Sequence, residues 1–375
     1  MTPVTGRPVR IGIIGCGQIA QSHLANYAEI ADAEVVACAD IRPEAADTSA
    51  AKFGIPNVYY TAAEMLRRDD LDAIDICMHN NLHISGTIAA LESGRPVYCE
   101  KPMAGTYRDA QAMRDRAKEL GLYLHIQLAT LYSPETRAAQ ELIAAGQLGT
   151  LYHARSTGHR RRGRPYIDGY GRADFVQKEK SAGGALYDMG VYHISQILHL
   201  LGNPVVERVS GQTYQKMAMD PKRSELSGAN VEELGMGFVR FAGGDMTMDV
   251  IEAWAIHLDS FEGSYIVGSE GGVRLNPFGF FRSAGDLDLN SGANMGDFGY
   301  RKRKLRTEDG DTDTFSSSQR HWIAALQGKI ALLPTAEIAL NTMLISEGIY
   351  LSTQERREVT AEEIVARSIS KALPL

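Results

Sequence analysis

A glycine-rich turn between a strand-like run and a helical run is the feature that most limits the possible folds of this chain. The largely apolar residues 10–14 are followed directly by Gly15-Cys16-Gly17-Gln18-Ile19-Ala20, and a helical spacing of apolar residues continues to Ile30. This fits the G-x-G-x-x-G/A pattern, in which the first glycine makes a tight turn, the second lets the backbone approach a pyrophosphate, and the small last residue allows close helix–strand packing. The helix N-terminus adds N–H donors and a positive dipole for the anion. The turn predicts a parallel α/β fold that binds a dinucleotide; a glycine turn that binds nothing is the alternative.

An acidic residue ends the second predicted strand. This strand covers residues 34–39, and Asp40 follows it at roughly the spacing that the dinucleotide pattern expects. A carboxylate accepts hydrogen bonds from a ribose 2′-hydroxyl and repels a 2′-phosphate, so Asp40 favours NAD. Arg42 lies two residues later and could accommodate a 2′-phosphate, which leaves NADP as the alternative cofactor.

Strand and helix signals alternate up to residue 127 and then change character. In the first part, strands are predicted at 72–78, 96–99 and 122–128, and helices at 62–68, 85–93 and 106–119. Later, helices are predicted at 134–145, from 186, at 316–327 and at 335–352, strands at 149–156, 205–214, 235–241, 245–254 and 264–268, and an exposed excursion at 276–310. Consecutive strands without intervening helices indicate a largely antiparallel or mixed sheet. We predict an α/β protein with a doubly wound parallel Rossmann domain over 1–127 and an α+β domain with an open-faced mixed sheet over 128–375.

Charge, hydropathy and cysteine placement limit the partners and the compartment. The net charge of −7 argues against nucleic acid and anionic membranes. The apolar runs are too short to span a bilayer, and the N-terminus lacks the apolar stretch of a signal peptide. The four cysteines show no metal-ligand spacing and are expected to be buried, reduced thiols: Cys16, Cys38, Cys77 and Cys99. We therefore expect a cytoplasmic protein without a metal site.

The tripeptide Glu100-Lys101-Pro102 follows the strand predicted at 96–99. In open α/β sheets, ligands bind at the carboxyl ends of the strands, which is where Lys101 should lie. Partial desolvation beside a cationic nicotinamide would lower the pKa of this lysine, so that it could move a proton as hydride leaves a carbinol. A surface lysine before a chain-breaking proline is the alternative.

A second constellation runs from Gly183 to His193 and contains a carboxylate, a phenol and an imidazole. If an α-helix begins near residue 186, Asp188 and Tyr192 share one face, and His193 points about 140° away. Such a set can orient and polarise a polyol. An ordinary amphipathic helix is the alternative.

In their order and spacing, these motifs together resemble the glucose–fructose oxidoreductase / inositol dehydrogenase / rhizopine catabolism (Gfo/Idh/MocA) family over essentially the whole chain. The resemblance implies a Rossmann domain and a C-terminal domain whose open-faced sheet commonly forms the oligomer interface, here of a homodimer or homotetramer. It also implies oxidation or reduction of a secondary hydroxyl of a sugar or cyclitol with NAD or NADP.

The resemblance assigns roles to particular residues. Lys101 would be the catalytic or substrate-orienting lysine and Asp188 the family's carboxylate. The position four residues after Asp188 is usually His and less often Tyr in the family; here it is Tyr192, with His193 next, and either could transfer the proton. Cofactor contacts are expected from Gly15, Cys16, Gly17, Gln18, Ile19, Asp40, Ile41, Arg42, His79, Asn80, Asn81, His83, Glu100 and Lys101. Substrate contacts are expected from Lys101, Gln127, Arg162, Arg164, Tyr166, Asp188 and His193.

The sequence departs from the family pattern in two loops. Residues 78–83 read Met-His-Asn-Asn-Leu-His where the family usually has Thr-Pro-Asn-x-x-His. Ala129 and Leu131 stand before Pro134 near the places where the family often has Asn and Arg. The basic run 159–164 precedes the Asp188 segment and could bind a polyol or an acidic sugar through arginine forks, or be a solvated loop or a subunit contact.

Three functions are consistent with these residues. The first is an NAD-dependent sugar or cyclitol dehydrogenase working in either direction. The second is a non-catalytic sensor of cofactor or sugar, which would be expected to lose Lys101 or Asp188, and both are present. The third is redox-assisted glycoside cleavage, in which transient oxidation of a ring carbon acidifies its neighbour and allows elimination without net use of NAD.

Overall fold

The chain forms two compact units in a computed structural model, which describes residues 2–163, 173–308 and 314–375. The first unit consists of Met1–Gln127, Thr314–Glu337 and Ile369–Leu375, and the second of Leu128–Asp313 and Ile338–Ser368. Arg164 and Tyr166 lie outside the described residues. Within the described parts of the chain, none of the helices combines the length and apolarity needed to cross a bilayer.

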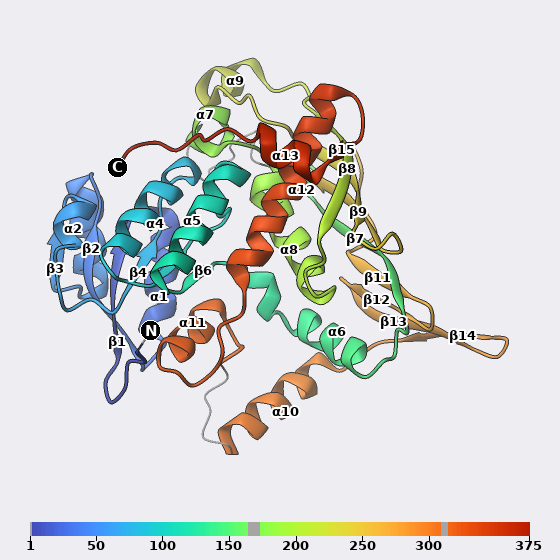
Figure 1. Ribbon diagram of the computed structural model, residues 1–375, viewed down its shortest axis with the longest axis horizontal. Coiled ribbons are helices and arrows are strands. Elements are labelled where there is room, and N and C mark those ends of the chain that lie inside the picture. Colours follow the sequence, from blue (N-terminus) through green and yellow to red (C-terminus); the bar gives the residue numbers. More distant parts are fainter. Residues whose placement is uncertain (1, 164–172, 309–313) are drawn as a thin grey trace. The chain divides into compact units, whose positions relative to one another are not determined.

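The first unit is built on a six-stranded parallel sheet in the order β3-β2-β1-β4-β5-β6. The strands are β1 (Val9–Ile14), β2 (Ala33–Ala39), β3 (Asn57–Tyr59), β4 (Ala73–Ile76), β5 (Val97–Cys99) and β6 (Leu124–Ile126). The helices are α1 (Gln18–Ala28), α2 (Pro43–Phe53), α3 (Ala62–Met65), α4 (His83–Glu92), α5 (Tyr107–Leu120) and α11 (Ser318–Leu326). Figure 1 shows α4 and α5 side by side over the sheet. The strand order reverses between β1 and β4, which is the switch point at which Rossmann folds bind ligands.

Both faces of this sheet are covered, as the apolar strands predict. Ile11 belongs to a buried cluster with Tyr27 of α1 and Trp322 of α11. The next residue, Gly12, faces the other side, where a Cβ atom would lie 3.0 Å from the Met65 side chain. The doubly wound parallel sheet is therefore confirmed.

The second unit is built on a nine-stranded sheet in the order β14-β13-β12-β11-β7-β10-β9-β8-β15. The strands are β7 (Leu151–His159), β8 (Val206–Tyr214), β9 (Leu234–Phe241), β10 (Thr247–Ala253), β11 (Tyr265–Gly268), β12 (Gly272–Leu275), β13 (Phe278–Ala284), β14 (Leu287–Ser291) and β15 (Val359–Thr360). Strands β7 and β10 pair in parallel, and the other pairs are antiparallel. The predicted mixed, largely antiparallel sheet is confirmed.

One face of this sheet is apolar and packs on helices, whereas the other is polar. The helices of the unit are α6 (Pro134–Ala144), α7 (Lys178–Ser181), α8 (Val191–Leu200), α9 (Pro221–Ser227), α10 (Met295–Glu308), α13 (Ala361–Arg367) and most of α12 (Thr335–Glu355). Along β9, Val239 and Phe241 are buried on one face, while Met236 and Arg240 are exposed on the other. This period of two is typical of a sheet with one open face.

The exposed excursion predicted at 276–310 has regular structure. It consists of the β13–β14 hairpin and helix α10. Figure 1 shows the hairpin projecting from the sheet, and Leu287 near its turn is 66% exposed. The strands β13 and β14 lie at one edge of the nine-stranded sheet.

Candidate functional site

The glycine turn after β1 has the backbone geometry that its sequence predicts. Gly15 has a φ of +92°, and a Cβ atom there would lie 2.3 Å from the carbonyl oxygen of Cys77. At Gly17 the nearest described atom to a Cβ would be the Arg42 guanidinium, at 4.0 Å, so the space beside this glycine is open. Helix α1 begins at Gln18 without a side-chain cap from Gly17. The turn therefore presents unshielded helix N–H groups to an anion, as a pyrophosphate site requires.

Asp40 lies beside this turn and is held there by three hydrogen-bonding groups. Its carboxylate accepts the N–H groups of Cys16 and Arg42, both at 2.9 Å, and the Arg42 guanidinium at 3.3 Å. Burial by itself would raise the pKa of Asp40, but these hydrogen bonds hold it below its ordinary value. The side chain is thus an ionised acceptor next to the pyrophosphate turn, which fits the ribose of a dinucleotide. Ile41 is 85% exposed beside it.

Glu100 and Lys101 follow β5 at the carboxyl edge of the same sheet. The Glu100 carboxylate accepts the N–H of Lys101 at 2.9 Å and lies 2.8 Å from Nε2 of His23. The other ring nitrogen of His23 lies 2.8 Å from the Asp75 carboxylate. Burial lowers the pKa of His23, but the neighbouring Asp75 outweighs it, and the pKa is raised well above its ordinary value. The buried imidazolium of His23 therefore lies between the Asp75 and Glu100 carboxylates. Glu100 in turn holds the backbone N–H of Lys101.

The loop after β4 is attached to the Lys101 segment through His83. His83 is buried, with Nδ1 2.7 Å from the carbonyl oxygen of Pro102 and Nε2 3.0 Å from that of Met78. Burial lowers its pKa. The turn before it, which carries His79, Asn80 and Asn81, lies at the same edge of the sheet. In this arrangement His83 supports the loop and the Pro102 backbone.

Gln127 ends the first segment of the unit, directly after β6. Its N–H donates to the carbonyl of Cys99 at 2.9 Å. Its Oε1 atom is buried and has no hydrogen-bond partner among the residues that the structure describes. A buried amide oxygen left without a donor is costly unless a ligand or water supplies one.

In the second unit, the Asp188 segment is a π-helix (Leu186–Gly190) that leads directly into α8. The buried Glu232 carboxylate accepts the N–H groups of Gly184 at 2.9 Å and Leu186 at 3.0 Å, which anchors the start of this wide turn. Such π-turns, with i→i+5 hydrogen bonds, are often found at functional sites.

The π-turn changes which side chains share a face. The indole Nε1–H of Trp254 donates to the Asp188 carboxylate at 3.1 Å, and Nδ1 of His193 lies 2.9 Å from the Glu252 carboxylate. Glu252 and Trp254 are two positions apart at the end of β10 and so face the same side of the sheet. Asp188 and His193 therefore both point to the same end of β10. An ideal α-helix would direct these two side chains about 140° apart. The i→i+5 hydrogen bonds of the π-turn bring residues five apart closer to one face.

The basic segment after β7 runs beside the same strand end. The N–H of Arg160 donates to the carbonyl of Ala253 at 2.8 Å, and Arg162 forms an antiparallel bridge with Ala255. Arg162 is thus placed next to the residue that follows Trp254. Its predicted companions, Arg164 and Tyr166, cannot be placed because they lie outside the described residues.

Two stretches of the chain match family descriptions. Residues 9–128 match the description "Oxidoreductase family, NAD-binding Rossmann fold", and residues 136–274 match the description "GFO/IDH/MocA C-terminal domain". The chain belongs to the Gfo/Idh/MocA family. It is accordingly an NAD-binding oxidoreductase, and the geometry of the Gly15 turn and Asp40 fits that cofactor.

Relatives of this Gfo/Idh/MocA protein extend over most of its length. D-glucoside 3-dehydrogenase of Escherichia coli (strain K12) is 28% identical over 358 residues, covering 94% of this chain and 97% of the relative. A dTDP-3,4-didehydro-2,6-dideoxy-α-D-glucose 3-reductase of Saccharopolyspora spinosa is 30% identical over 238 residues, covering 62% of this chain and 69% of the relative. The crystal structure of an oxidoreductase domain protein from Kribbella flavida shares the fold, with a TM-score of 0.81 at 19% identity, covering 95% of this chain and 100% of that one.

The structure adds site residues that the sequence pattern did not single out, namely His23, Asp75, Glu232, Glu252 and Trp254. Asp75 lies in the otherwise apolar strand β4, and Glu252 lies on the buried face of β10, where Met248 and Val250 precede it. A charged residue at such a position requires a partner, and this was the available signal.

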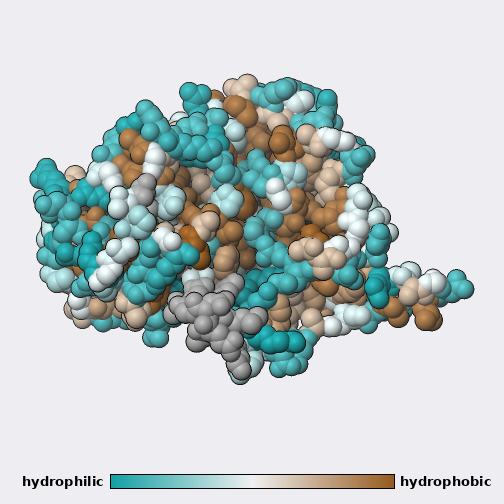
Figure 2. All heavy atoms as spheres, turned by 60° about the horizontal axis from the view of Figure 1, so that its bottom comes forward, coloured by the Kyte–Doolittle hydropathy of each residue, from teal (hydrophilic) through white to brown (hydrophobic). Residues whose placement is uncertain are grey.

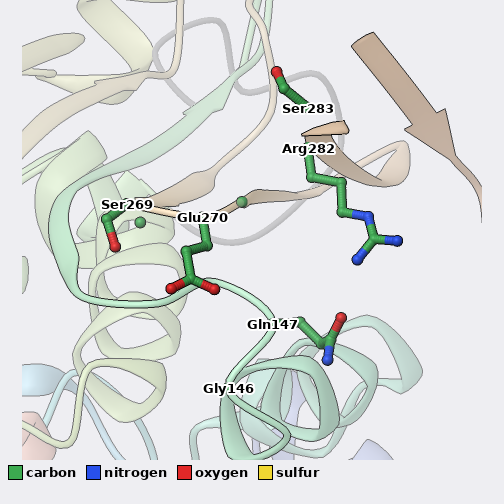
Figure 3. A pocket seen from close by; sticks show the side chains of 8 residues that line it. Gly146, Gln147, Ser269, Glu270, Arg282 and Ser283 are labelled. Carbon is green, nitrogen blue, oxygen red and sulfur yellow. The ribbon is translucent and has the colours of Figure 1, made fainter. Parts of the chain in front are cut away.

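A surface cavity of about 620 Å³ lies elsewhere in the second unit (Figure 3). It is lined by Gly146, Gln147, Gly268, Ser269, Glu270, Gly271, Arg282 and Ser283. None of the predicted site residues that the structure describes lines it, and it is polar and open. We assign it no role.

Proposed function

We propose that this Gfo/Idh/MocA protein transfers hydride between NAD and a secondary hydroxyl or ketone of a sugar, a sugar derivative or a cyclitol. The observation that carries the proposal is the pairing of two built sites in one chain. One is the open glycine turn with an ionised Asp40, and the other is the carboxylate–imidazole set held at the end of β10. The E. coli and S. spinosa relatives are a glucoside dehydrogenase and a deoxysugar reductase, which supports a sugar as the substrate.

When bound, NAD supplies the hydride acceptor, and the cofactor-binding residues hold it. The Gly15–Ile19 turn would bind the pyrophosphate, and Asp40 would accept hydrogen bonds from the adenosine ribose. Arg42 is engaged by Asp40, so its guanidinium is not poised for a 2′-phosphate, and we propose a preference for NAD over NADP. The loops that carry Ile41, His79, Asn80, Asn81, His83 and Glu100 would shape the rest of the cofactor site.

We propose roles for the residues that are predicted to contact the substrate. Lys101 would orient the reacting hydroxyl, and Asp188, with its carboxylate fixed by Trp254, would hold a neighbouring one. The unpaired Oε1 of Gln127 would accept a substrate hydroxyl proton in a hydrogen bond. Arg162, Arg164 and Tyr166 would line the substrate site, and Tyr192 or His193 would transfer the proton.

We also propose that the protein forms a homodimer or homotetramer through the open face of the second sheet. On this face Asp249 bonds to Nε of Arg155 at 2.6 Å and to His153 at 3.2 Å, and these side chains are 18–29% exposed. Met236 is 39% exposed on the same face, and the projecting β13–β14 hairpin carries apolar side chains among polar ones (Figure 2). Light scattering of the purified protein tests the assembly.

We propose that the protein is cytoplasmic, because four buried free thiols favour a reducing compartment.

The catalytic proposal is tested with purified protein, NAD and a panel of D-glucosides, free pyranoses and inositols. We expect reduced nicotinamide to accumulate with at least one D-glucoside or pyranose. The proposal would be contradicted if no compound reduced NAD and none of the corresponding ketones consumed NADH. Release of aglycone without reduced cofactor would favour redox-assisted glycoside cleavage instead.

A further inference from the structure

The imidazole of His193 packs against two neighbouring strands of the second unit, β7 and β10. Its Nδ1 atom is 2.9 Å and 3.1 Å from the two carboxylate oxygens of Glu252, which is fully buried. The Ser156 hydroxyl donates to the same carboxylate at 3.2 Å. Because Glu252 is already fixed by Ser156 and by its strand, it sets the direction of the imidazole ring.

A glycine leaves the room that the ring occupies. Gly158 of β7 is the register partner of Glu252 in the parallel β7–β10 pair. A Cβ atom at Gly158 would lie 2.1 Å from Cε1 and 2.5 Å from Nδ1 of His193. Real Cβ atoms do not approach so closely, so the ring can take this position only above a residue without a side chain.

The second ring nitrogen of His193 is available for chemistry. The side chain is 27% exposed, and among the described residues no hydrogen bond to Nε2 is present. By contrast, His83 and His23 of the first unit have partners on both ring nitrogens. With Nδ1–H donated to Glu252, the lone pair is on Nε2.

Tyr192, the other candidate, is placed differently. It is the preceding residue of α8 and lies about 100° around the helix from His193. Its carbonyl oxygen accepts the hydroxyls of Thr130 at 2.8 Å and Ser195 at 3.2 Å, so this residue is tied to its surroundings through its backbone.

We propose that His193 is the proton-transfer residue of this enzyme and that Glu252 is the positioning residue that orients it and stabilises its charged form. The proposal rests on the proposed function. In the oxidation direction, Nε2 takes the hydroxyl proton, the O–H electron pair becomes the second C=O bond, and the C–H pair leaves as hydride to the oxidised nicotinamide. In the reduction direction, the imidazolium returns the proton to the carbonyl oxygen. Glu252 holds Nδ1–H in both directions and remains ionised.

The charges around the ring support this role. Burial lowers the pKa of His193, Glu252 raises it and Arg160 lowers it, and the result is a pKa above the ordinary value. Among the residues that the structure describes, the charged groups that act on the ring are Glu252 on β10 and Arg160 after β7. A raised pKa stabilises the imidazolium that forms when the ring accepts the substrate proton.

The first test measures the pKa of His193 by NMR titration of its ring in the protein without substrate. In Glu252→Gln we expect the pKa to fall below that of wild type and below about 6.5, because burial and Arg160 then act unopposed. Glu207→Gln makes the same chemical change at an exposed site on β8 and should leave the pKa unchanged. An unchanged pKa of His193 in Glu252→Gln would overturn the role of Glu252.

The second test compares turnover of the variants on the best substrate of the panel. We expect His193→Asn to lose about 10²–10⁴-fold in kcat and Tyr192→Phe to lose less than about tenfold. In Glu252→Gln, the acid limb of the kcat/KM profile for oxidation should move to lower pH, and the maximum should fall. Gly158→Ala should lose activity to a similar extent as His193→Asn, because its Cβ would fill the space that the imidazole ring occupies.

The opposite result, a large loss in Tyr192→Phe with near-normal activity in His193→Asn, would overturn the proposal. Failure of the broader function looks different. If wild type turns over no substrate, the dehydrogenase assignment and with it the proton-transfer role are refuted, while the NMR titration still decides whether Glu252 sets the charge of His193.

Discussion

Replacing His23 by leucine should destabilise the first unit strongly and in a pH-dependent way. The change removes a buried imidazolium that lies 2.8 Å from each of two carboxylates, Asp75 and Glu100, which are 0% and 4% exposed. Leaving a buried charge without its partner costs about 3–5 kcal/mol, a large part of the roughly 5–15 kcal/mol of a typical domain. With a urea m value of about 1–3 kcal/mol/M, the unfolding midpoint should fall by at least about 1 M.

The pH dependence follows from the direction of the pKa shift. The pKa of folded His23 is raised, so its stabilisation is complete below the unfolded pKa of about 6.5 and is lost as the pH rises through the folded pKa. Between these two values, wild type should lose about 1.4 kcal/mol per pH unit relative to His23→Leu. The gap between the two proteins should therefore narrow as the pH is raised from about 7.

The assay is urea unfolding followed by the fluorescence of Trp322, which is buried in the first unit, in a Trp254→Phe background. His125→Leu is the matched control, since His125 is equally buried but bonds to the hydroxyls of Thr335 and Ser318. Its loss should be smaller and independent of pH above about 6.5, because the pKa of His125 is lowered by burial. Two results would refute a charged His23 between Asp75 and Glu100. One is a loss of unfolding free energy below about 1 kcal/mol in His23→Leu, and the other is a stability difference from wild type that does not change with pH.

Three further changes test the proposed sites. Gly15→Ala should weaken NAD binding at least about tenfold in calorimetry, because its Cβ would meet the Cys77 carbonyl at a positive φ; wild-type affinity would contradict the turn geometry. Asp40→Asn should lower the preference for NAD over NADP at least about tenfold by removing a like-charge repulsion, measured as the ratio of dissociation constants, and an unchanged ratio would remove Asp40 from the ribose site. Trp254→Phe deletes a buried donor to the Asp188 carboxylate, a bond worth about 1.5–3 kcal/mol, so kcat/KM should fall about 10–100-fold with NAD affinity unchanged. Equal activity of Trp254→Phe and wild type would show that this bond does not position Asp188.

Local sequence signals were sufficient for the parts of the site that depend on neighbouring residues. The turn after β1 needs glycine at position 15 because of its positive φ and the nearby Cys77 carbonyl, whereas Gly17 leaves open space. Asp40 and Lys101 follow strands whose sequences are mostly apolar. These features can be predicted because strand ends of a parallel sheet meet at one edge. The predicted burial of the four cysteines is confirmed for the same reason, since they lie in or beside these strands.

The remaining features depend on contacts between distant parts of the chain. The π-turn at Asp188 is anchored by Glu232, more than forty residues away, and helix periodicity alone predicts an ordinary α-helix there. The sequence did not predict helix α2 or strand β3. Helix α2 is rich in alanine and β3 has only three residues, so neither shows a clear periodic pattern of apolar residues. The return of residues 314–337 and 369–375 to the first unit depends on long-range hydrogen bonds, such as that from the Leu373 N–H to the Asn81 carbonyl at 2.9 Å.

The most direct test of the central claim follows the hydride itself. The best substrate of the panel, carrying deuterium on the reacting carbinol carbon, is incubated with the protein and NAD, and the nicotinamide product is examined by mass spectrometry. Direct hydride transfer predicts one deuterium in the reduced cofactor and none released to water. Unlabelled reduced cofactor, with deuterium lost to the solvent, would contradict the account.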